Sequence, residues 1–342
     1  MNNPQQRFAE PIDDSREPRE APEWRRKDSR LQADEPVEPI LTRGRSRWFW
    51  PGVSLLILVA IFGGMGAAGA LLTHVVTTTK TISVGSAPRL ILTSQAGSAH
   101  VVAGSAGQIQ VVMRQRVLQG NAQSVPVHFD LSPDGDTLTI TSTQVPEVNV
   151  NFFDYNSGVN FTISVPSQTA LDIHTDSGDI SSQEINGQMT LTTSSGDITT
   201  DGGSGQITLA SSSGDVSASN VSGRLQLSSS SGSISATNAS ATGDSTFQTD
   251  SGDITYQGAL APGASFGFDT SSGSVNLTLP SSSSFQIRAS TDSGSIDSEF
   301  ATVTVLRGAG SGTAAGGMVG SPPYAQISIQ VSSGDIRLLA AQ

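Results

Sequence analysis

The chain has 342 residues, a formal net charge of −12 and no cysteine. The lack of cysteine excludes disulfides, thiolate metal sites and cysteine nucleophiles, and the acidic balance argues against a nucleic-acid partner, because phosphate binding requires a basic face. Aromatic residues make up only 5% while 36 residues are glycine. This composition favours stacked short strands over a large aromatic core.

Residues 1–47 hold ten Lys or Arg and ten Asp or Glu with almost no apolar periodicity. Such a segment cannot bury enough surface to offset the entropy of ordering. We therefore expect a disordered cytoplasmic tail. A docking segment for a cytoplasmic partner, with Trp24 as its anchor, is the functional alternative.

An uncharged stretch of 26 residues runs from Trp48 to Thr73. At 1.5 Å per residue, a helix of this length crosses a hydrocarbon layer of ~30 Å. Three arginines precede it at positions 43, 45 and 47, so the positive-inside rule places the N-terminus in the cytoplasm. The sequence predicts a single transmembrane helix over residues 48–74, with the C-terminal part outside the cell membrane.

Two alternatives concern this apolar segment. Small residues near its end, such as Ala68 and Ala70, would suit a cleavable signal peptide, but the 47 preceding residues are long for that purpose. The pair Gly63 and Ala67 has the small-xxx-small spacing that lets two membrane helices approach, so a homodimer through this helix stays open.

After a short stalk at residues 75–81, the chain is expected to form an extracytoplasmic β domain over residues 82–342. Residues 82–165 alternate apolar and polar side chains and predict an N-terminal β region that caps the domain. Within it, the runs 125–131 and 137–140 flank a turn that contains Gly135. This pattern predicts a β-hairpin.

Residues 166–342 contain a repeat marked by Ser-Gly. Its glycines are Gly178, Gly196, Gly214, Gly232, Gly252, Gly273, Gly294 and Gly334. The steps between them are 18, 18, 18, 20, 21, 21 and 40 residues, and we interpret the last step as two coils, one of them degenerate.

Apolar residues accompany each repeat at fixed distances. An Ile or Val follows each glycine by two residues, and an apolar residue precedes it by five. This is the pattern of a strand, a tight corner and a second strand. Further glycines at 187, 205, 223 and 243 suggest a second corner in each coil. The expected fold is all-β, a parallel β-helix or β-solenoid with coils of about 18–21 residues.

The Ser-Gly-Asp-Ile repeat behind an N-terminal anchor resembles the bacterial putative-adhesin family, whose members carry membrane-anchored β-strand-repeat domains of unknown function. The resemblance covers roughly residues 82–342. It implies a repeat architecture and, through the family name, adhesion. No binding residue is carried over from it.

Aspartate follows the corner glycine in several coils. Asp179, Asp197 and Asp215 would stack about 5 Å apart, so they are the candidates for contact with a cation such as calcium. A solvated turn is the simpler interpretation, because Asp favours turns and one carboxylate per coil supplies too few ligands for a calcium ion. We expect no other metal site and no cofactor.

No catalytic residues are expected. Polysaccharide-active β-helix enzymes gather carboxylates and basic residues on one face, whereas the arginines here are far apart in sequence and the histidines lie in no triad context. The sequence favours a non-enzymatic cell-surface protein that presents its solenoid to an envelope protein or a glycan. An envelope-sensing accessory that signals through its cytoplasmic tail is the alternative, and a polysaccharide-active enzyme comes third.

Overall fold

The computed structural model describes residues 73–341 except 119–124, 144–157 and 308–311. Every regular element in this part of the chain is a β-strand, which confirms the all-β expectation. No helix within the described residues is long and apolar enough to cross a membrane. The predicted tail and nearly all of the predicted transmembrane segment, including its proposed dimer contact, lie outside the described residues.

The strands fall into three groups along the chain. The N-terminal group is β1 (Thr73–Ser83), β2 (Arg89–Ala96), β3 (Ala99–Gly104), β4 (Gln108–Leu118), β5 (Val127–Leu131), β6 (Thr137–Ser142) and β7 (Val159–Pro166). The middle group is β8 (Ala170–Ser177), β9 (Ile180–Ile185), β10 (Met189–Ser195), β11 (Ile198–Ser213), β12 (Val216–Ser229), β13 (Ile234–Ala241), β14 (Ser245–Ser251) and β15 (Ile254–Leu260). The C-terminal group is β16 (Ser265–Ser272), β17 (Val275–Pro280), β18 (Phe285–Ser293), β19 (Ile296–Ser298), β20 (Val303–Arg307), β21 (Thr313–Val319), β22 (Ala325–Ser333) and β23 (Ile336–Ala341).

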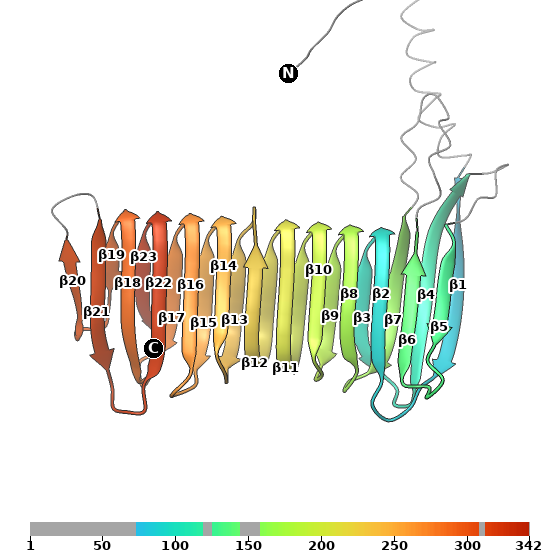
Figure 1. Ribbon diagram of the computed structural model, residues 1–342, viewed down its shortest axis with the longest axis horizontal. Helices are drawn as coiled ribbons and strands as arrows, with labels where there is room; N and C mark the ends of the chain where they lie inside the picture. Colours follow the sequence, from blue (N-terminus) through green and yellow to red (C-terminus); the bar gives the residue numbers. More distant parts are fainter. Residues whose placement is uncertain (1–72, 119–124, 144–157, 308–311, 342) are drawn as a thin grey trace, which may run out of the picture. The chain divides into compact units, whose positions relative to one another are not determined.

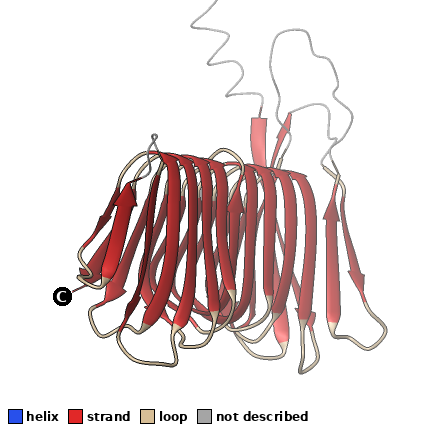
Figure 2. Ribbon diagram, turned by 60° about the vertical axis from the view of Figure 1, so that its left-hand side comes forward, coloured by secondary structure: helices blue, strands red, loops and turns tan. Residues whose placement is uncertain are grey.

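Each repeat forms one coil, which we define as a strand before the Ser-Gly corner and a strand after it. The strands before the corner pair in parallel with each other, as β8 does with β10, and those after the corner pair likewise, as β9 does with β11. The register joins equivalent residues of successive repeats, for example Ile173 with Leu191. The coils therefore build two facing layers, a first sheet before the corners and a second sheet after them (Figure 2).

The C-terminal coil is inserted inside the stack. Strand β22 pairs with β16 on one side and with β18 on the other, and β23 lies in the same way between β17 and β19 (Figure 1). The coil that is last in the chain is thus next to last in space. Beyond β18 the first sheet ends with two antiparallel strands, β21 and then β20.

At the N-terminal end, too, the order of the strands in space differs from their order in the chain. Strand β2 lies between β6 and β8, and β3 lies between β7 and β9, so the first coil of the chain is not the outermost one. Antiparallel strands lie outside it: β5 pairs with β6, while β4 pairs with β7 and then with β1. Both ends of the first sheet and the N-terminal end of the second sheet therefore finish in antiparallel strands that cover parallel edges.

Several expectations need correction. The segment 75–81, expected as a stalk, lies within β1 and pairs with β4, because β4 offers an open strand edge there and Thr and Val favour extended backbone. The region 82–165 contains one complete coil, β2–β3, as well as capping strands. The 40-residue step holds the β20–β21 pair and one coil, not two coils. The predicted hairpin is confirmed as β5–β6, with Gly135 at φ 75° in its turn.

The hydrophobic core lies between the two sheets. Leu, Ile and Val fill most of it, and the strands that border it alternate buried residues with more exposed ones, as in β22. Larger aromatic side chains gather in the C-terminal coils, where Phe247 and Phe268 stack with ring centroids 4.8 Å apart. Tyr256 packs edge-on against Phe247 and donates its hydroxyl to the Ala259 carbonyl at 2.7 Å. The inward faces are thus occupied, which leaves the outward faces for recognition.

Candidate functional site

The corner glycines predicted from the sequence form one column. A Cβ placed on Gly196 would lie 2.3 Å from the carbonyl oxygen of Gly178, and one on Gly214 would lie 2.0 Å from that of Gly196. Gly196 also has φ 149°, which side chains rarely adopt. The column extends beyond the predicted set, because Gly97 of β2–β3 stands at the same place below Gly178. These glycines are required by the close approach of successive coils.

The aspartates after the corner act as hydrogen-bond acceptors between coils. The Asp197 backbone N–H donates to Asp179 Oδ1 at 3.0 Å, and the Asp215 N–H donates to Asp197 Oδ1 at 2.9 Å. The next coil repeats the contact with the Ser233 N–H and Asp215 Oδ1 at 2.8 Å. Each carboxylate therefore satisfies a backbone donor at the turn of the neighbouring coil.

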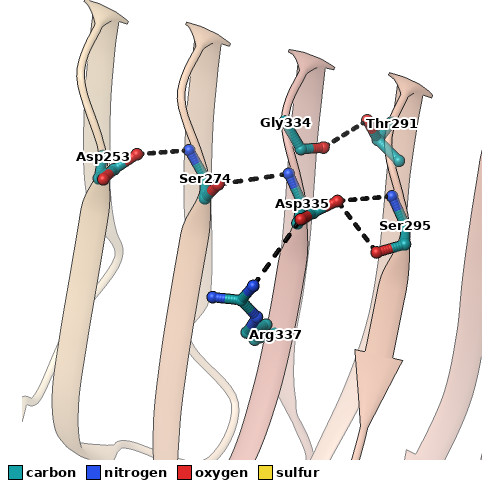
Figure 3. Close-up of polar contacts among 7 residues, drawn as sticks. All are labelled: Asp253, Ser274, Thr291, Ser295, Gly334, Asp335 and Arg337. Carbon is teal, nitrogen blue, oxygen red and sulfur yellow. Dashed lines mark hydrogen bonds and ion pairs between the residues drawn. The ribbon is translucent and has the colours of Figure 1, made fainter.

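Figure 3 shows the same ladder at the inserted C-terminal coil. Ser274 N–H donates to Asp253 Oδ1 at 2.7 Å, and Ser295 donates to Asp335 Oδ1 through its N–H at 2.8 Å and its hydroxyl at 2.9 Å. These bonds from the Ser295 amide and hydroxyl hold the pKa of the Asp335 carboxyl below its ordinary value of 3.8. Arg337 lies 3.8 Å from the same carboxylate.

These bonds account for the aspartate column without a cation. No cluster of three or more His, Cys, Asp or Glu within the described residues is placed to hold a metal ion. One carboxylate oxygen of Asp179, Asp197 and Asp215 is already used by a backbone amide. The arrangement thus favours the solvated-turn interpretation of these residues.

Sequence reasoning missed a buried hydroxyl column three residues before each corner. Thr193 and Ser211 donate their hydroxyls to the carbonyls of Gly178 and Gly196 at 3.1 and 3.0 Å. Thr291 does the same for Gly334 at 2.9 Å (Figure 3). A Thr or Ser at this place in nearly every repeat was the available signal, but an inward position is ordinarily apolar.

The predicted second corner glycines, Gly187, Gly205, Gly223 and Gly243, form a shorter column than expected. A Cβ on Gly205 or Gly223 would meet a backbone oxygen of the preceding coil at 2.7 or 1.8 Å. Gly243 differs, because its nearest neighbours are Arg224 side-chain atoms at 3.8 Å, an ordinary contact. The coils lengthen from 18 to 20 residues at this point, so the column is interrupted.

A hollow of about 510 Å³ opens on the outward face of the first sheet, over β12, β14, β16, β22 and β18. We call it the Arg-lined hollow. Its walls carry Arg224 and Gln226 on the β12 side and Gln286 and Arg288 on the β18 side. Neither the sequence repeat nor the arginine spacing predicts it, since its middle is formed by the inserted strand β22, which separates β16 from β18.

The floor of the Arg-lined hollow follows from one row of the register. Thr246, Gly267 and Ser328 are neighbours in this row, which runs from Gln226 to Arg288 across five strands. Small residues in the middle and long ones at both ends produce a depression. Beneath it lie the buried Phe266 and Ile327.

A second, acidic hollow of about 360 Å³ adjoins it along the same strands. Its lining includes Asp250, Asp269 and Asp292 together with Gln248 and Gln330. Burial raises the pKa of Asp269 above its ordinary value of 3.8. The outward face therefore places positive and negative groups side by side over the same four strands.

One further pair of polar side chains lies on the second sheet. His100 Nδ1 and Ser181 Oγ are 2.6 Å apart, because β3 and β9 pair in register there. Within the described residues no carboxylate is bonded to His100, so the third member of a nucleophile triad is missing from this contact. The hollows on the first sheet are the stronger candidate site.

A family model covers most of this architecture, from residue 92 to residue 339. The chain belongs to the Toastrack DUF4097 family. This assignment confirms the resemblance inferred from the Ser-Gly-Asp-Ile repeat. The match contains both hollows and every corner glycine of the column.

Solved structures similar to this Toastrack chain share little sequence with it. One, "a putative cell adhesion protein" from Clostridium sporogenes, is 12% identical, with a TM-score of 0.31 over 78% of this chain and 100% of that chain. Another, "a putative adhesin" from Bacteroides fragilis, is 13% identical, with a TM-score of 0.37 over 77% and 97%. A third, "putative adhesin" from Parabacteroides distasonis, is also 13% identical, with a TM-score of 0.39 over 77% and 97%. No curated protein matches the chain.

Proposed function

We propose that this Toastrack protein is a non-enzymatic cell-surface protein whose stacked coils form a rigid β-solenoid outside the membrane. The N-terminal apolar segment anchors it, and the cytoplasm holds the charged tail. The outward face of the first sheet binds an envelope component. The observation that carries this proposal is the pair of hollows on the outward face of the first sheet, where each strand pairs with a neighbouring strand on both sides.

The rigidity of this face supports a binding role. Strands β14, β16, β22 and β18 each pair with a neighbour on both sides, so their outward side chains stand on a continuous ladder. A rigid support lowers the entropy lost when a ligand is bound. The two hollows also lie within the size range of small-molecule sites.

The polar character of the face favours a glycan over a protein partner. Its exposed lining consists of Arg, Asp, Gln, Ser and Thr side chains, and the apolar Phe266 and Ile327 are buried beneath them. Protein interfaces depend on a few exposed aromatic or apolar anchors. A polyhydroxylated ligand instead uses the amide and hydroxyl groups that are present here.

The test is retention of the full-length chain, purified in a mild detergent and immobilised, against purified envelope polysaccharide and against solubilised membrane proteins. We expect saturable retention of polysaccharide. Retention of a single membrane protein without polysaccharide would contradict the proposal. Cell fractionation with and without residues 48–74 tests the anchor, and release of the shortened chain from the membrane fraction is the expected result.

The sensing alternative predicts a different dependence on the tail. A binding protein keeps its retention of polysaccharide after deletion of residues 1–40, because the hollows lie far along the chain. Loss of a cellular response with retention intact would support the sensing role. Measuring both in the same deletion strain separates the two functions.

A further inference from the structure

Two charged groups of opposite sign face the outward surface near Gly267 without partners. Within the described residues, the side chains of Arg288 and Asp269 take part in no hydrogen bond or ion pair. Arg224, on the opposite wall, differs because its guanidinium lies 3.8 Å from Asp244. One cationic and one anionic site are therefore left open on the same face.

Gly267 marks the space between them. A Cβ at this glycine would meet only Asp269 Oδ2 at 3.7 Å and Thr246 Cγ2 at 3.8 Å, which are ordinary contact distances. Its backbone is not in the left-handed region, unlike that of Gly196. Neither close approach nor conformation requires glycine here, and a glycine inside a strand without such a need is typical of a place where a ligand approaches the backbone.

The position of Asp269 joins the two hollows. Its carboxylate leans back toward Gly267, as the distance of 3.7 Å shows, although the residue belongs to the acidic hollow. Strand β22 separates β16, which carries Asp269, from β18, which carries Arg288. Two strand spacings and a two-residue offset place their Cα atoms roughly 12 Å apart, a separation that one disaccharide-sized ligand can bridge.

We propose that the Arg-lined hollow binds a zwitterionic saccharide unit, with its anionic group on Arg288 and its ammonium group on Asp269. This inference rests on the proposed function and specifies its ligand class. Gln226, Gln286 and Gln326 surround the space and supply donors and acceptors for sugar hydroxyls. A ligand with one charge would leave the other protein group unpaired.

Burial supports the need for a cationic partner at Asp269. The partly buried carboxylate has a raised pKa, which means that its charged form is less favourable than in water. An ammonium group beside it would restore the missing interaction. Charge-assisted hydrogen bonds of this kind are about twice as strong as neutral ones.

The test is calorimetric titration of the full-length chain in a mild detergent with three tetrasaccharides. The zwitterionic probe alternates glucosamine with glucuronic acid. Its N-acetylated form is only anionic, and its carboxyl-reduced form is only cationic. We expect the zwitterionic probe to bind about ten-fold more tightly than either of the others. Equal affinity for the three probes would overturn the inference.

Matched variants assign each charge. Asp269→Asn should remove the preference over the N-acetylated probe, and Arg288→Gln should remove the preference over the carboxyl-reduced probe. Arg89→Gln, an exposed arginine of the same sheet, should keep both preferences. Unchanged preferences in Asp269→Asn and Arg288→Gln would overturn the inference.

Failure of this inference and failure of the proposed function give different results. If envelope polysaccharide is retained but no probe preference exists, the zwitterion assignment is wrong and the binding role stands. If neither polysaccharide nor any probe is bound, both are wrong. Circular dichroism of each variant establishes that its fold is intact.

Discussion

At the residue scale, the Ser-Gly corner combines two requirements. The glycine lets a backbone carbonyl of the preceding coil approach where a Cβ would stand, and the following Asp or Ser accepts a hydrogen bond from the next coil. The buried Thr or Ser three residues earlier donates to the corner carbonyl. Each coil is thus fixed to its neighbour by side chains as well as by the strand ladder.

The close approach of successive coils makes the corner glycines sensitive to substitution. Gly196→Ala should lower the free energy of unfolding by about 2–4 kcal/mol. The new methyl group would clash with the Gly178 carbonyl oxygen, and the φ of 149° at this position is unfavourable for alanine. Gly243→Ala is the matched control and should change stability by less than about 1 kcal/mol. Urea titration of the full-length chain measures both. Equal midpoints for the two variants would contradict the close-packing account.

The Asp335 carboxylate makes the stability of the fold depend on pH. Because the pKa of Asp335 is lowered in the folded chain, its carboxylate stabilises the fold above the unfolded-state value of about 3.9. This contribution is lost as the pH falls through the lowered folded pKa. Asp335→Asn should be less stable than the native chain at pH 6, and the difference should shrink steadily below pH 4. A difference that stays constant from pH 6 to pH 2.5 would show that the carboxylate charge does not matter.

The sequence predicts the role of a residue where that residue recurs at a fixed step, and fails to predict it elsewhere. The corner glycines and inward Ile and Val recur at fixed steps and were found. The role of Asp179 as an acceptor for Asp197 N–H was not, because turn preference alone does not specify a partner. Gly267 was also missed, since it stands at an outward strand position where no periodic signal exists.

At the scale of elements, the order of the coils in space departs from their order in the chain at both ends. Strand β22 separates β16 from β18, and β2 separates β6 from β8. The repeat predicts stacking between consecutive coils, and no local pattern indicates that a coil returns between two earlier ones. The 40-residue step was the only signal of an irregularity, and the β20–β21 pair accounts for its length.

Cysteine pairs test this order directly, because the native chain has no cysteine. Asp269 pairs with Gln330, and Gln330 pairs with Ser290, so each of these double cysteine variants should form a disulfide readily. The pair at 269 and 290 is separated by two strand spacings, about 10 Å, and should not. Mild oxidation followed by mass spectrometry shows which of the three variants forms a disulfide. Crosslinking at 269 and 290 in preference to the other pairs would mean that β16 and β18 are neighbours.

At the scale of the whole molecule, the outward face of the first sheet is acidic in one hollow and basic in the other, although the chain carries a net charge of −12. The all-β class and the family follow from the repeat. The hollows do not, because they require residues from β12 to β18 to meet in one row, and that row depends on the inserted coil.

Calcium should leave the melting temperature of the full-length chain unchanged at millimolar concentration. The corner carboxylates each give one oxygen to a backbone amide, and one aspartate per coil supplies fewer ligands than the six to eight oxygens that calcium takes. Differential scanning calorimetry with calcium and with a chelator measures this. A clear rise that the chelator reverses would identify the aspartate column as a cation site.

The central claim is that the face above Gly267 is where the envelope component binds. The most direct measurement compares retention of envelope polysaccharide by the full-length native chain and by Gly267→Val, which adds a side chain to the floor of the Arg-lined hollow where a Cβ meets only side-chain atoms, at ordinary contact distances. Thr190→Val, at the equivalent outward position of β10, is the matched control. The account predicts that Gly267→Val loses at least about ten-fold in affinity while Thr190→Val binds as the native chain does. Native affinity in a folded Gly267→Val chain would contradict it.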